Sequence, residues 1–371
     1  MENKKKKFYI TTPIYYVNDV PHIGHAYTTV ICDTIANFNK WLGNKVNFLT
    51  GTDEHGQKVE KSALKANMDP QTFTDNVSKS FKKLASKLEI NNTDFIRTTE
   101  DRHINSVKHL WNILVNTGDI YIDKYSGWYS IRDEAFYSND EVIEDKNGKK
   151  LAPNGSEVEW IEEPSYFFKL SSWQDKLLKF YEKNPDFISP KSRYNEVLSF
   201  VNGGLEDLSI SRTTFNWGIK VPDNDDHVIY VWLDALTNYI SALDYPNKNS
   251  KNWKSFWPAD IHVVGKDILR FHAVYWPAFL MAAELEVPKK IYAHGWWTVD
   301  GKKMSKSTGN VISPEVIIDK YGLDQFKYFL LREVRFGQDG DFSEEALVKR
   351  VNSDLSNDYG NLAQRVLTFI Y

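Results

Sequence analysis

Short apolar runs and longer helical patterns alternate along the first hundred residues. KFYITT, residues 7–12, is rich in β-branched and aromatic side chains, which predicts a strand. Residues 22–41 have a helical pattern, and Asn18 or Asp19 just before it is a candidate N-cap. KVNFLTGTDEHG, residues 45–56, predicts a second strand that runs into an acidic loop bounded by glycines. A strand, a helix and a strand in this order predict a parallel sheet, whose ligands bind beyond the carboxyl ends of its strands.

The pattern changes between about residues 118 and 212. Turn sequences and aromatic pairs replace the alternation of strands and helices, which predicts a smaller inserted domain. Strand and helix patterns return at residues 227–240 and again at residues 260–283. Residues 289–310 predict a strand, a hairpin around Asp300-Gly301 and a lysine-rich loop. The rest of the chain is helical in pattern and ends in an amphipathic segment marked by Leu355, Tyr359, Leu362 and Val366.

Composition narrows the range of functions. With 371 residues and 42% hydrophobic content, the chain can form two or three domains with sizeable cores. The net charge of −4 means that any contact with nucleic acid must use local basic patches. Cys32 is the single cysteine, which excludes an internal disulfide and a cysteine-rich zinc site.

The N-terminus has basic residues before an apolar run, as a signal peptide does. The run is short, however, and Thr11, Thr12 and Pro13 break it without a small-residue cleavage site, so we interpret it as a first strand with a lysine tail. No stretch has the length and purity of a transmembrane helix. We therefore expect a cytoplasmic protein with no membrane contact, and the sequence implies no protein partner.

Two short motifs carry candidate chemistry. In His22-Ile23-Gly24-His25 two histidines three residues apart share one helix face, and the glycine lets a ligand come close. The alternative is a surface helix start with two solvated histidines. The later segment KMSKS, residues 303–307, combines two lysines with hydroxyls before a glycine, which suits a phosphate-binding loop. The alternative there is an ordinary solvated charged loop.

Taken together, the two motifs resemble the signature pair HIGH and KMSKS of class I aminoacyl-tRNA synthetases. Further segments are similar to methionyl-tRNA synthetases of the bacterial or organellar type, and this resemblance covers nearly the whole chain. The segments are FLTGTDEHGQK, EEPSYFFKLS, NEVLSFVNGGLEDLSISR, YVWLDALTNYI, VGKDILRFHAVYWPAFLMA and HGWWTVDGKKMSKSTGNVI.

The resemblance implies the fold class and its division. We expect an α/β fold, a Rossmann-like doubly wound parallel sheet with an inserted connective domain and a C-terminal helical segment. The expected parts are the first half of the catalytic domain at 1–116, the insertion at 117–215, the second half at 216–300, the KMSKS loop and stem-contact region at 301–351, and the start of a helical anticodon-binding domain at 352–371. Because only the beginning of that last domain is present, we expect adenylate formation to be retained and tRNA charging to be weak.

The resemblance also implies a methionine–tRNA ligase reaction. Methionine attacks the α-phosphate of ATP to give methionyl adenylate, and the acyl group then passes to the 3′-terminal adenosine of tRNA(Met). Positioning and charge stabilisation dominate such a phosphoryl displacement. The catalytic residues that the resemblance implies are His22, His25, Lys303 and Lys306. The ATP-binding residues that it implies are Gly24, Gly265, Lys266, Asp267, His294 and Lys306, of which Asp267 has the alternative of a simple helix cap.

Methionine needs one anion for its ammonium group and an apolar slot for its thioether. By resemblance the anion is Asp53, whose alternative is a loop aspartate that stabilises its own turn. The remaining methionine-binding residues implied are Ile14, Tyr16, Trp232, Leu236, Tyr239, Ile268, Phe271 and His272. For Trp232, Tyr239 and Phe271 the alternative is an ordinary hydrophobic core, because the spacing of 232, 236 and 239 would serve a core face equally well, and for His272 it is a core histidine.

Metal and partner expectations follow from the same comparison. ATP is expected to act with Mg²⁺. Many members of the family hold zinc on four cysteines in the insertion, but the matching stretch YSGWYSIRDEAFYSNDEV has none, so we expect no zinc. The partners expected are methionine and the acceptor end of tRNA(Met), the latter through the insertion and the basic 302–306 segment.

Other assignments stay open on the sequence. The short insertion argues against the leucyl, isoleucyl and valyl enzymes, which carry a large editing domain, and the missing cysteines argue against the cysteinyl enzyme. A small-molecule nucleotidyltransferase would share the histidine motif and the sheet. A tRNA-binding protein without catalysis is a third possibility. Methionine-dependent exchange of pyrophosphate into ATP would separate these alternatives.

Overall fold

A central parallel sheet organises the protein. The computed structural model describes residues 6–17, 20–133, 135–137, 139–299, 301–304 and 310–371. The sheet runs in the order β10-β16-β15-β1-β3-β2, with β4 also paired to β3, and every pairing in it is parallel. Its strands are β1 (Lys7–Thr11), β2 (Tyr15–Tyr16), β3 (Lys45–Asp53), β4 (Asp94–Arg97), β10 (Ile188–Ser189), β15 (Ile261–Gly265) and β16 (Ile291–His294).

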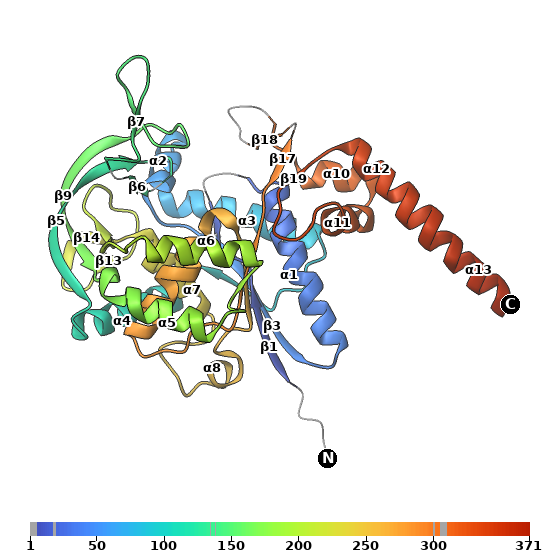
Figure 1. Ribbon diagram of the computed structural model, residues 1–371, viewed down its shortest axis with the longest axis horizontal. Helices are drawn as coiled ribbons and strands as arrows, with labels where there is room; N and C mark the ends of the chain where they lie inside the picture. Colours follow the sequence, from blue (N-terminus) through green and yellow to red (C-terminus); the bar gives the residue numbers. More distant parts are fainter. Residues whose placement is uncertain (1–5, 18–19, 134, 138, 300, 305–309) are drawn as a thin grey trace.

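Helices cover both faces of this sheet, as the doubly wound prediction requires (Figure 1). One face packs against α4 (Asp101–Asn116), α5 (Gln174–Lys183), α6 (Lys191–Asn202), α7 (Val231–Ser241) and α9 (Trp276–Ala282). The other face packs against α1 (Ile23–Trp41), part of α3 (Pro70–Lys87), α10 (Pro314–Tyr321), α11 (Leu323–Arg332) and α12 (Glu344–Arg350). Two further helices are α2 (Gln57–Lys65) and α8 (Lys251–Phe256).

Alternation along the strands explains why two cores form. Tyr9 belongs to the first core and its neighbour Ile10 to the second, and the same alternation separates Leu49 from Phe48. Successive side chains of a strand point to opposite faces, and a parallel sheet covered on both faces therefore has nearly continuous apolar strands. The apolar runs in the sequence are such strands.

An antiparallel sheet with the order β11-β9-β5-β6 lies to one side of the central sheet. In Figure 1 its two long strands form the curved ribbon at the left edge. Its strands are β5 (Ile120–Ser130), β6 (Ala135–Tyr137), β9 (Glu159–Phe168) and β11 (Leu208–Ser209), and a small hairpin of β7 (Ile143–Glu144) and β8 (Lys150–Leu151) projects from it. β12 (Ser211–Arg212), β13 (Lys220–Val221) and β14 (Asn224–Ile229) form a third sheet.

The return from this region to the central sheet is earlier than the expected insertion boundary. Ile188–Ser189, which lies inside the range 117–215, pairs with Ile291 and Tyr292 of β16. The helices α5 and α6 on either side of it belong to the first core. The expected domain limits stay a prediction, and the pairing shows only that residues 188–189 are part of the central sheet.

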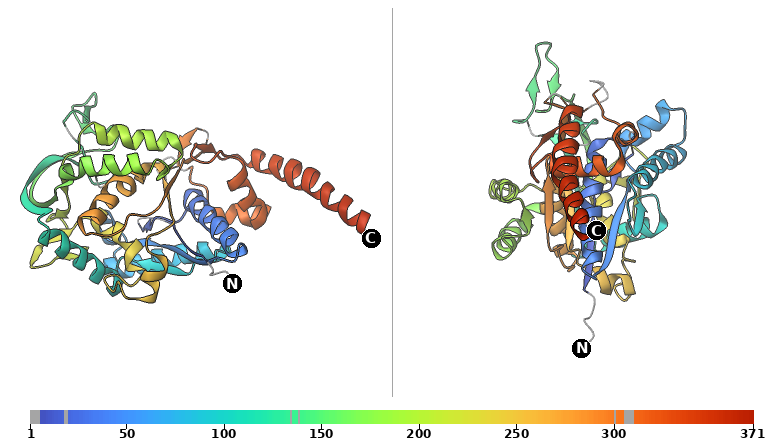
Figure 2. Two further views of the ribbon diagram at one scale, coloured as in Figure 1. Left: turned by 60° about the horizontal axis from the view of Figure 1, so that its bottom comes forward. Right: turned by 90° about the vertical axis from the view of Figure 1, so that its right-hand side faces the viewer.

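The last part of the chain begins with a small mixed sheet. β17 (Trp297–Val299) pairs antiparallel with β18 (Lys302–Lys303), as the predicted hairpin requires, and parallel with β19 (Gly340–Asp341). After α12, a π-helical stretch, Val351–Gly360, continues into α13 (Asn361–Ile370). Figure 1 and the left view of Figure 2 show α13 leading away from the body of the molecule. The apolar side chains of its amphipathic pattern, such as Leu362 and Val366, are exposed.

Candidate active site

The carboxyl ends of neighbouring parallel strands bring the candidate residues of separate segments to one edge of the sheet. Ile14 and Tyr16 follow β1, and Asp53 is the last residue of β3. Gly265 ends β15 and is paired with His294, which ends β16. Since parallel strands share the direction of their ends, the expected nucleotide and amino-acid residues gather where ligands of open α/β sheets bind.

The two histidines of the HIGH motif form the start of α1. The sequence prediction of Asn18 or Asp19 as the cap is wrong, because His22 itself is the N-cap. The His22 ring accepts from the Gly24 N–H at 3.0 Å, and the His22 N–H donates to Nδ1 of His25 at 3.0 Å. This is a capping box made by imidazoles in place of a hydroxyl and a carboxylate. These two hydrogen bonds hold the imidazole rings of His22 and His25 close together, with centroids 4.0 Å apart.

This cap determines the protonation of both rings. A nitrogen that accepts from a backbone N–H carries no proton, so Nδ1 of His22 and Nδ1 of His25 are both unprotonated and Nε2 of each neutral ring bears the hydrogen. Burial and the neighbouring His22 ring lower the pKa of His25 well below its ordinary value. The motif therefore presents neutral N–H donors at a helix N-terminus, where the helix dipole favours an anion.

Gly24 is required by the histidine beside it. A Cβ at position 24 would lie 2.8 Å from Cε1 of the His22 ring, closer than such atoms approach. The ring occupies that space in order to reach the Gly24 N–H. The glycine of the motif thus has a structural role that its predicted contact with the nucleotide does not explain.

His294 connects β16 to α1. Its Nδ1 donates to the Gly295 carbonyl at 2.8 Å, since a carbonyl only accepts, and its Nε2 lies 2.8 Å from the Thr28 hydroxyl. The ring is buried, and burial lowers the pKa of His294. The neutral ring fixes the end of β16 against the second turn of α1, and Thr28 is a residue that the sequence motifs did not mark.

Lys266 and Asp267 are held by two residues that sequence reasoning missed. The Lys266 ammonium group lies 2.6 Å from a carboxylate oxygen of Asp339 and 4.2 Å from the centroid of the Trp296 ring. Trp296 Nε1 donates to Asp267 at 3.1 Å, and its backbone N–H donates to Asp339 at 2.8 Å. Gly295 allows this contact, because a Cβ there would lie 2.2 Å from the Gln338 carbonyl oxygen. The loop before β19 therefore contacts Lys266 directly and Asp267 through Trp296.

Asp53, the candidate anion, begins a loop whose following residues are fixed from several sides. Asp53 is buried, with 6% of the residue exposed. Glu54 accepts from Arg97 at 2.7 and 2.9 Å, and its carbonyl accepts from Trp217 Nε1 at 2.5 Å. His55 contacts Asp234 of α7 at 2.7 Å. A loop bound this tightly holds Asp53 at the end of β3 with little freedom to move.

The expected methionine slot consists of stacked aromatic rings on α7 and on a π-helical turn, Phe271–Tyr275, before α9. π-helical turns within helices often mark functional sites. The Trp232 and Phe271 rings are stacked with centroids 3.4 Å apart. The Tyr239 hydroxyl lies 2.7 Å from Nε2 of His272, whose Nδ1 donates to the Ile268 carbonyl at 2.9 Å. Burial lowers the pKa of His272 to about 4, so its ring is neutral and accepts from the tyrosine.

The remaining slot candidates differ in depth. Leu236 is buried beside Tyr239 in the first core, while Ile14 and Ile268 are half-buried against it. Tyr16 lies in a separate small cluster, where the Lys58 ammonium group is 5.3 Å from its ring centroid. Core packing and ligand binding explain the burial of Leu236 equally well. Ile14, Trp232 and Phe271 are partly exposed, so a ligand could contact them.

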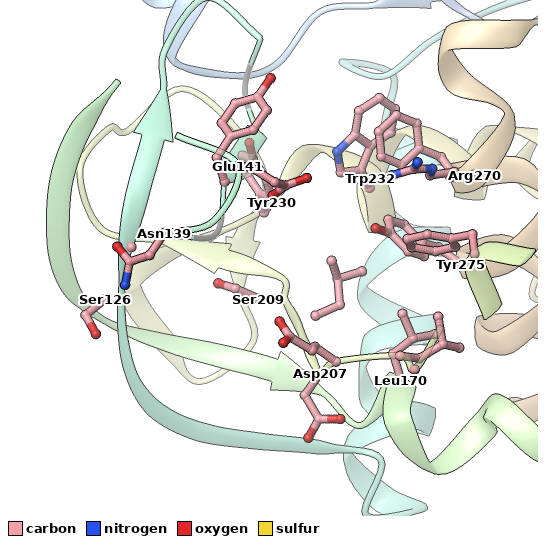
Figure 3. Close-up of a pocket in the computed structure, with 18 of the residues that line it drawn as sticks. Ser126, Asn139, Glu141, Leu170, Asp207, Ser209, Tyr230, Trp232, Arg270 and Tyr275 are labelled. Carbon is pink, nitrogen blue, oxygen red and sulfur yellow. The ribbon is translucent and has the colours of Figure 1, made fainter. Parts of the chain in front are cut away.

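A cleft of about 570 Å³ opens next to the Trp232–Phe271 stack, between the insertion and the catalytic body (Figure 3). Figure 3 shows Arg270, Trp232 and Tyr275 on one side of it and strands of the insertion on the other. Its acidic and basic lining residues are Glu141, Glu206, Asp207, Arg212 and Arg270. The sequence motifs marked only Trp232 and Phe271 of this cleft.

The KMSKS segment is described only in part. The backbone of Lys303 pairs with Thr298 in the β17–β18 hairpin, and Met304 packs against the second core. Lys306 lies outside the described residues. The position of the hairpin is set by β19, which belongs to the same segment as Asp339.

No helix among the described residues combines the length and the apolar character needed to cross a membrane. In the same part of the chain, no three histidine, cysteine, aspartate or glutamate side chains are grouped as a metal site would require.

The chain is similar to a well-defined set of known proteins. A family model described as tRNA synthetases class I (M) matches residues 8–367. Methionine–tRNA ligase of Rickettsia felis is 64% identical over 367 residues, which are 99% of this chain and 71% of the relative. The enzyme of the same name from Brucella suis is 55% identical over 366 residues, again 99% of this chain and 71% of the relative.

A solved structure extends the likeness to three dimensions. The Mycobacterium tuberculosis methionyl-tRNA synthetase in complex with methionyl-adenylate matches with a TM-score of 0.96 and 51% identity, over 98% of this chain and 72% of that one. Because the family model spans nearly the whole sequence and the relatives are more than half identical over the matched residues, the chain belongs to the class I tRNA synthetases of the (M) family.

Proposed function

We propose that this chain is a methionine–tRNA ligase that activates methionine with ATP and transfers it to tRNA(Met). The family match and the relatives at 55–64% identity support this assignment. The observation that carries it is the meeting of the His22–His25 cap, Asp53 and the Gly265–His294 pair at one edge of the parallel sheet. An anion-binding helix start and a carboxylate are what ATP and an amino acid need side by side.

In the first step the methionine carboxylate attacks the α-phosphate of ATP, and pyrophosphate leaves. The chain supplies no nucleophile, so it acts by orienting the two substrates and by stabilising the charge on the phosphates. We assign the Nε2–H donors of His22 and His25 to the phosphate oxygens, because the cap leaves these nitrogens protonated. Lys303 and Lys306 are assigned to the departing pyrophosphate.

The ribose and the adenine are assigned to the ends of β15 and β16. Asp267 accepts from a tryptophan N–H in this structure, and it is exposed enough to accept from ribose hydroxyls as well. The Lys266 ammonium group is paired with the Asp339 carboxylate. We therefore expect it to contact the nucleotide with its positive charge partly neutralised by that carboxylate. Gly265 has no Cβ and His294 is neutral, which leaves the strand ends open and uncharged for the base.

Methionine is assigned between Asp53 and the aromatic rings of the slot. The carboxylate of Asp53 binds the ammonium group, and Trp232, Phe271 and the neutral Tyr239–His272 pair receive the thioether. A neutral histidine suits this place, because an imidazolium would repel the ammonium end of the substrate. The remaining side chains assigned to the methionine site are the partly exposed Ile14, Tyr16 and Ile268.

Mg²⁺ is assigned to the nucleotide, and zinc is not assigned. The described residues contain no carboxylate cluster that could form a cage for Mg²⁺, so the ion enters with the phosphates that coordinate it. At the tip of the insertion, the potential metal ligands of Ser130, Asp133, Asn154 and Ser156 are all oxygen atoms, and these side chains hydrogen bond to one another. Structural zinc prefers thiolate and imidazole ligands, so these residues do not fit it. Metal analysis of protein purified without chelators tests this assignment, and stoichiometric zinc would overturn it.

The acceptor end of tRNA(Met) is assigned to the cleft beside the Trp232–Phe271 stack. Aromatic rings that line it can stack on an unpaired base, which is how single-stranded nucleic acid is commonly held. The lining contains more carboxylates than guanidinium groups, so phosphate contacts belong elsewhere, on the basic segment around residue 302. The cytoplasm is the compartment that we assign to the enzyme.

Methionine-dependent exchange of labelled pyrophosphate into ATP is the experiment that tests the function. A methionine–tRNA ligase catalyses this exchange without tRNA, because adenylate formation is reversible on the enzyme. A small-molecule nucleotidyltransferase or a tRNA-binding protein without catalysis would not respond to methionine. Exchange that is absent, or that another amino acid supports better than methionine, contradicts the proposal.

A further inference from the structure

A buried carboxylate with two histidines contains none of the site residues that the sequence predicted. Asp234 in α7 is fully buried, and each of its oxygens accepts one imidazole N–H. Nδ1 of His55 lies 2.7 Å from Oδ2, and Nε2 of His103 lies 2.7 Å from Oδ1. Burial alone would raise the pKa of Asp234, but the two histidines outweigh it and lower that pKa to about 2. The group is therefore a carboxylate whose hydrogen bonds are satisfied by two separate elements.

The three residues join parts of the chain that are far apart in sequence. His55 belongs to the loop after β3, His103 to α4, and Asp234 to the first turn of α7. His103 is completely buried, and its other nitrogen lies 3.1 Å from the Ser241 hydroxyl, one further contact between α4 and α7. The carboxylate is thus supported from behind by α4, while His55 connects it to the loop.

The loop and the helix carry opposite ends of the candidate methionine site. The loop begins with Asp53, the assigned partner of the ammonium group. The helix carries Trp232 and Tyr239, which belong to the assigned thioether slot, and Asp234 lies between them in sequence. The His55–Asp234 contact is a direct side-chain bond between these two elements.

We propose that His55, Asp234 and His103 are positioning residues that fix the distance between the ammonium site and the thioether slot, and so select the length of the amino-acid side chain. This inference rests on the proposed function, because it needs Asp53 and α7 to hold methionine. A charged hydrogen bond in a buried site is stronger than a neutral one and has a narrow range of lengths. It therefore suits the task of holding a loop and a helix in register.

The experiment compares polar and apolar replacements of His55. His55→Asn keeps an N–H near the position of Nδ1, His55→Gln places its N–H about one bond further out, and His55→Leu removes it. Pyrophosphate exchange is measured with methionine, with ethionine, which is one methylene longer, and with norvaline, which is one atom shorter. KM for ATP is measured in the same series.

We expect KM for methionine to rise in the order wild type, Asn, Gln, Leu, reaching about tenfold in His55→Leu while KM for ATP stays within about twofold. One methylene in an apolar pocket is worth about 10- to 200-fold in kcat/KM. The preference for methionine over ethionine and norvaline should fall by about tenfold in the Gln and Leu variants. His103→Gln and His103→Leu should follow the same order with smaller changes, because His103 supports the carboxylate from behind.

His227→Leu is the matched control. His227 is also buried and has one hydroxyl contact, Ser211 at 2.9 Å, but it lies in the third sheet, outside the methionine site. The His227→Leu substitution should lower the melting temperature without changing KM for methionine or the preference among the three amino acids.

Three outcomes overturn the inference. One is equal KM and preference in His55→Asn and His55→Gln, which both keep a polar side chain and remain informative if His55→Leu does not fold. Another is a rise in KM for ATP as large as that for methionine. The third is wild-type protein without methionine-dependent exchange, which also removes the proposed function. If the wild type shows methionine-dependent exchange but the His55 variants have the same KM for methionine and the same amino-acid preference as the wild type, only the inference fails.

Discussion

At the residue scale, the histidine side chains of the HIGH motif hydrogen bond to the backbone at the start of α1, in addition to the ligand contacts proposed for them. The ring of His22 caps α1, that of His25 completes the capping box, and Gly24 leaves room for the capping ring. The same contacts that start the helix fix the tautomer of both rings. The proposed catalytic donors and the helix cap are therefore the same two side chains, and replacement of either histidine would change both.

Lys306→Ala tests the role of the KMSKS segment. If Lys306 contacts the phosphates mainly as pyrophosphate leaves, its contact is stronger in the transition state than in the ground state. The substitution should lower the rate of adenylate formation by about 100- to 1,000-fold, with small effects on the binding of methionine and ATP. Lys306→Arg keeps the charge but not the compact ammonium group, and should restore only part of the rate. The measurement is single-turnover adenylate formation over a range of both substrates.

Asp53→Asn is the contrasting variant in that experiment. It should raise the methionine concentration needed for half-maximal rate, because the ammonium partner is lost from ground-state binding too. A single-turnover rate for Lys306→Ala within about threefold of wild type would show that the segment is a bystander.

At the scale of elements, the tip of the insertion is held by a hydrogen-bonded cluster of Ser130, Asp133 and Ser156. The Asp133 carboxylate accepts from the Ser130 hydroxyl at 3.0 Å and from the hydroxyl of Ser156, and Tyr137 donates to it at 3.1 Å. Burial raises the pKa of Asp133, but these hydroxyl donors outweigh it and hold the pKa below its usual value. Ser130 and Ser156 are buried, so the cluster fastens the end of β5 to the turn before β9.

Ser156→Ala should loosen this tip. Loss of a hydrogen bond to a partly buried, charged carboxylate costs about 1.5–3 kcal/mol, so amide hydrogens around residues 130–158 should exchange roughly tenfold or more faster, while pyrophosphate exchange is unchanged. Hydrogen exchange by mass spectrometry reports the change. Lys149→Ala is the control, since it removes only an exposed ion pair with Glu157, which is worth little. Equal exchange rates in the two variants would show that the hydroxyl cluster does not hold the tip.

At the scale of the whole molecule, the fold buries several histidines in neutral form around the central sheet. Burial lowers the pKa of His25, His262, His272 and His294. For His272 the shift is from 6.5 to about 4. The fold therefore excludes protons that the unfolded chain would accept, and its stability depends on pH.

The direction of this dependence follows from the two protonation states. Below pH 6.5 the unfolded chain binds protons first, so these histidines contribute stability that is present above pH 6.5 and is lost as the pH falls toward 4. The shift of His272 alone corresponds to roughly 3 kcal/mol at about 1.4 kcal/mol per pKa unit. The urea midpoint should therefore fall clearly between pH 7.5 and pH 5.

His262→Asn tests whether a buried neutral histidine causes this loss of stability at acid pH. It keeps a polar group near Nδ1 for the Thr11 hydroxyl, which lies 2.8 Å away in the native protein, but it cannot take up the proton. The fall of the urea midpoint toward acid pH should become shallower in this variant. A midpoint that does not change between pH 7.5 and pH 5 in the wild type would contradict the interpretation.

Secondary structure with a strong local pattern was predictable, and weakly patterned elements were not. The strand and helix predicted for residues 7–12 and 22–41 are β1 and α1, because each has an unbroken apolar period. No strand was predicted for the residues of β4, nor for those of β10, which lie inside the predicted insertion. Strands of four and two residues are too short to show a period, and only their parallel pairing with β3 and β16 makes them strands.

The family could be inferred from the sequence alone, because HIGH, KMSKS and the TDEHG loop occur together in one chain. Which side chains contact one another follows only from the tertiary structure. Asp234 lies 131 residues from His103 and 179 residues from His55, and Lys266 lies 73 residues from Asp339. Such pairs leave no periodic signal along the chain. They form because His55 and Lys266 follow β3 and β15, whose carboxyl ends lie at one edge of the sheet, and because the buried charge of Asp234 requires hydrogen-bond donors.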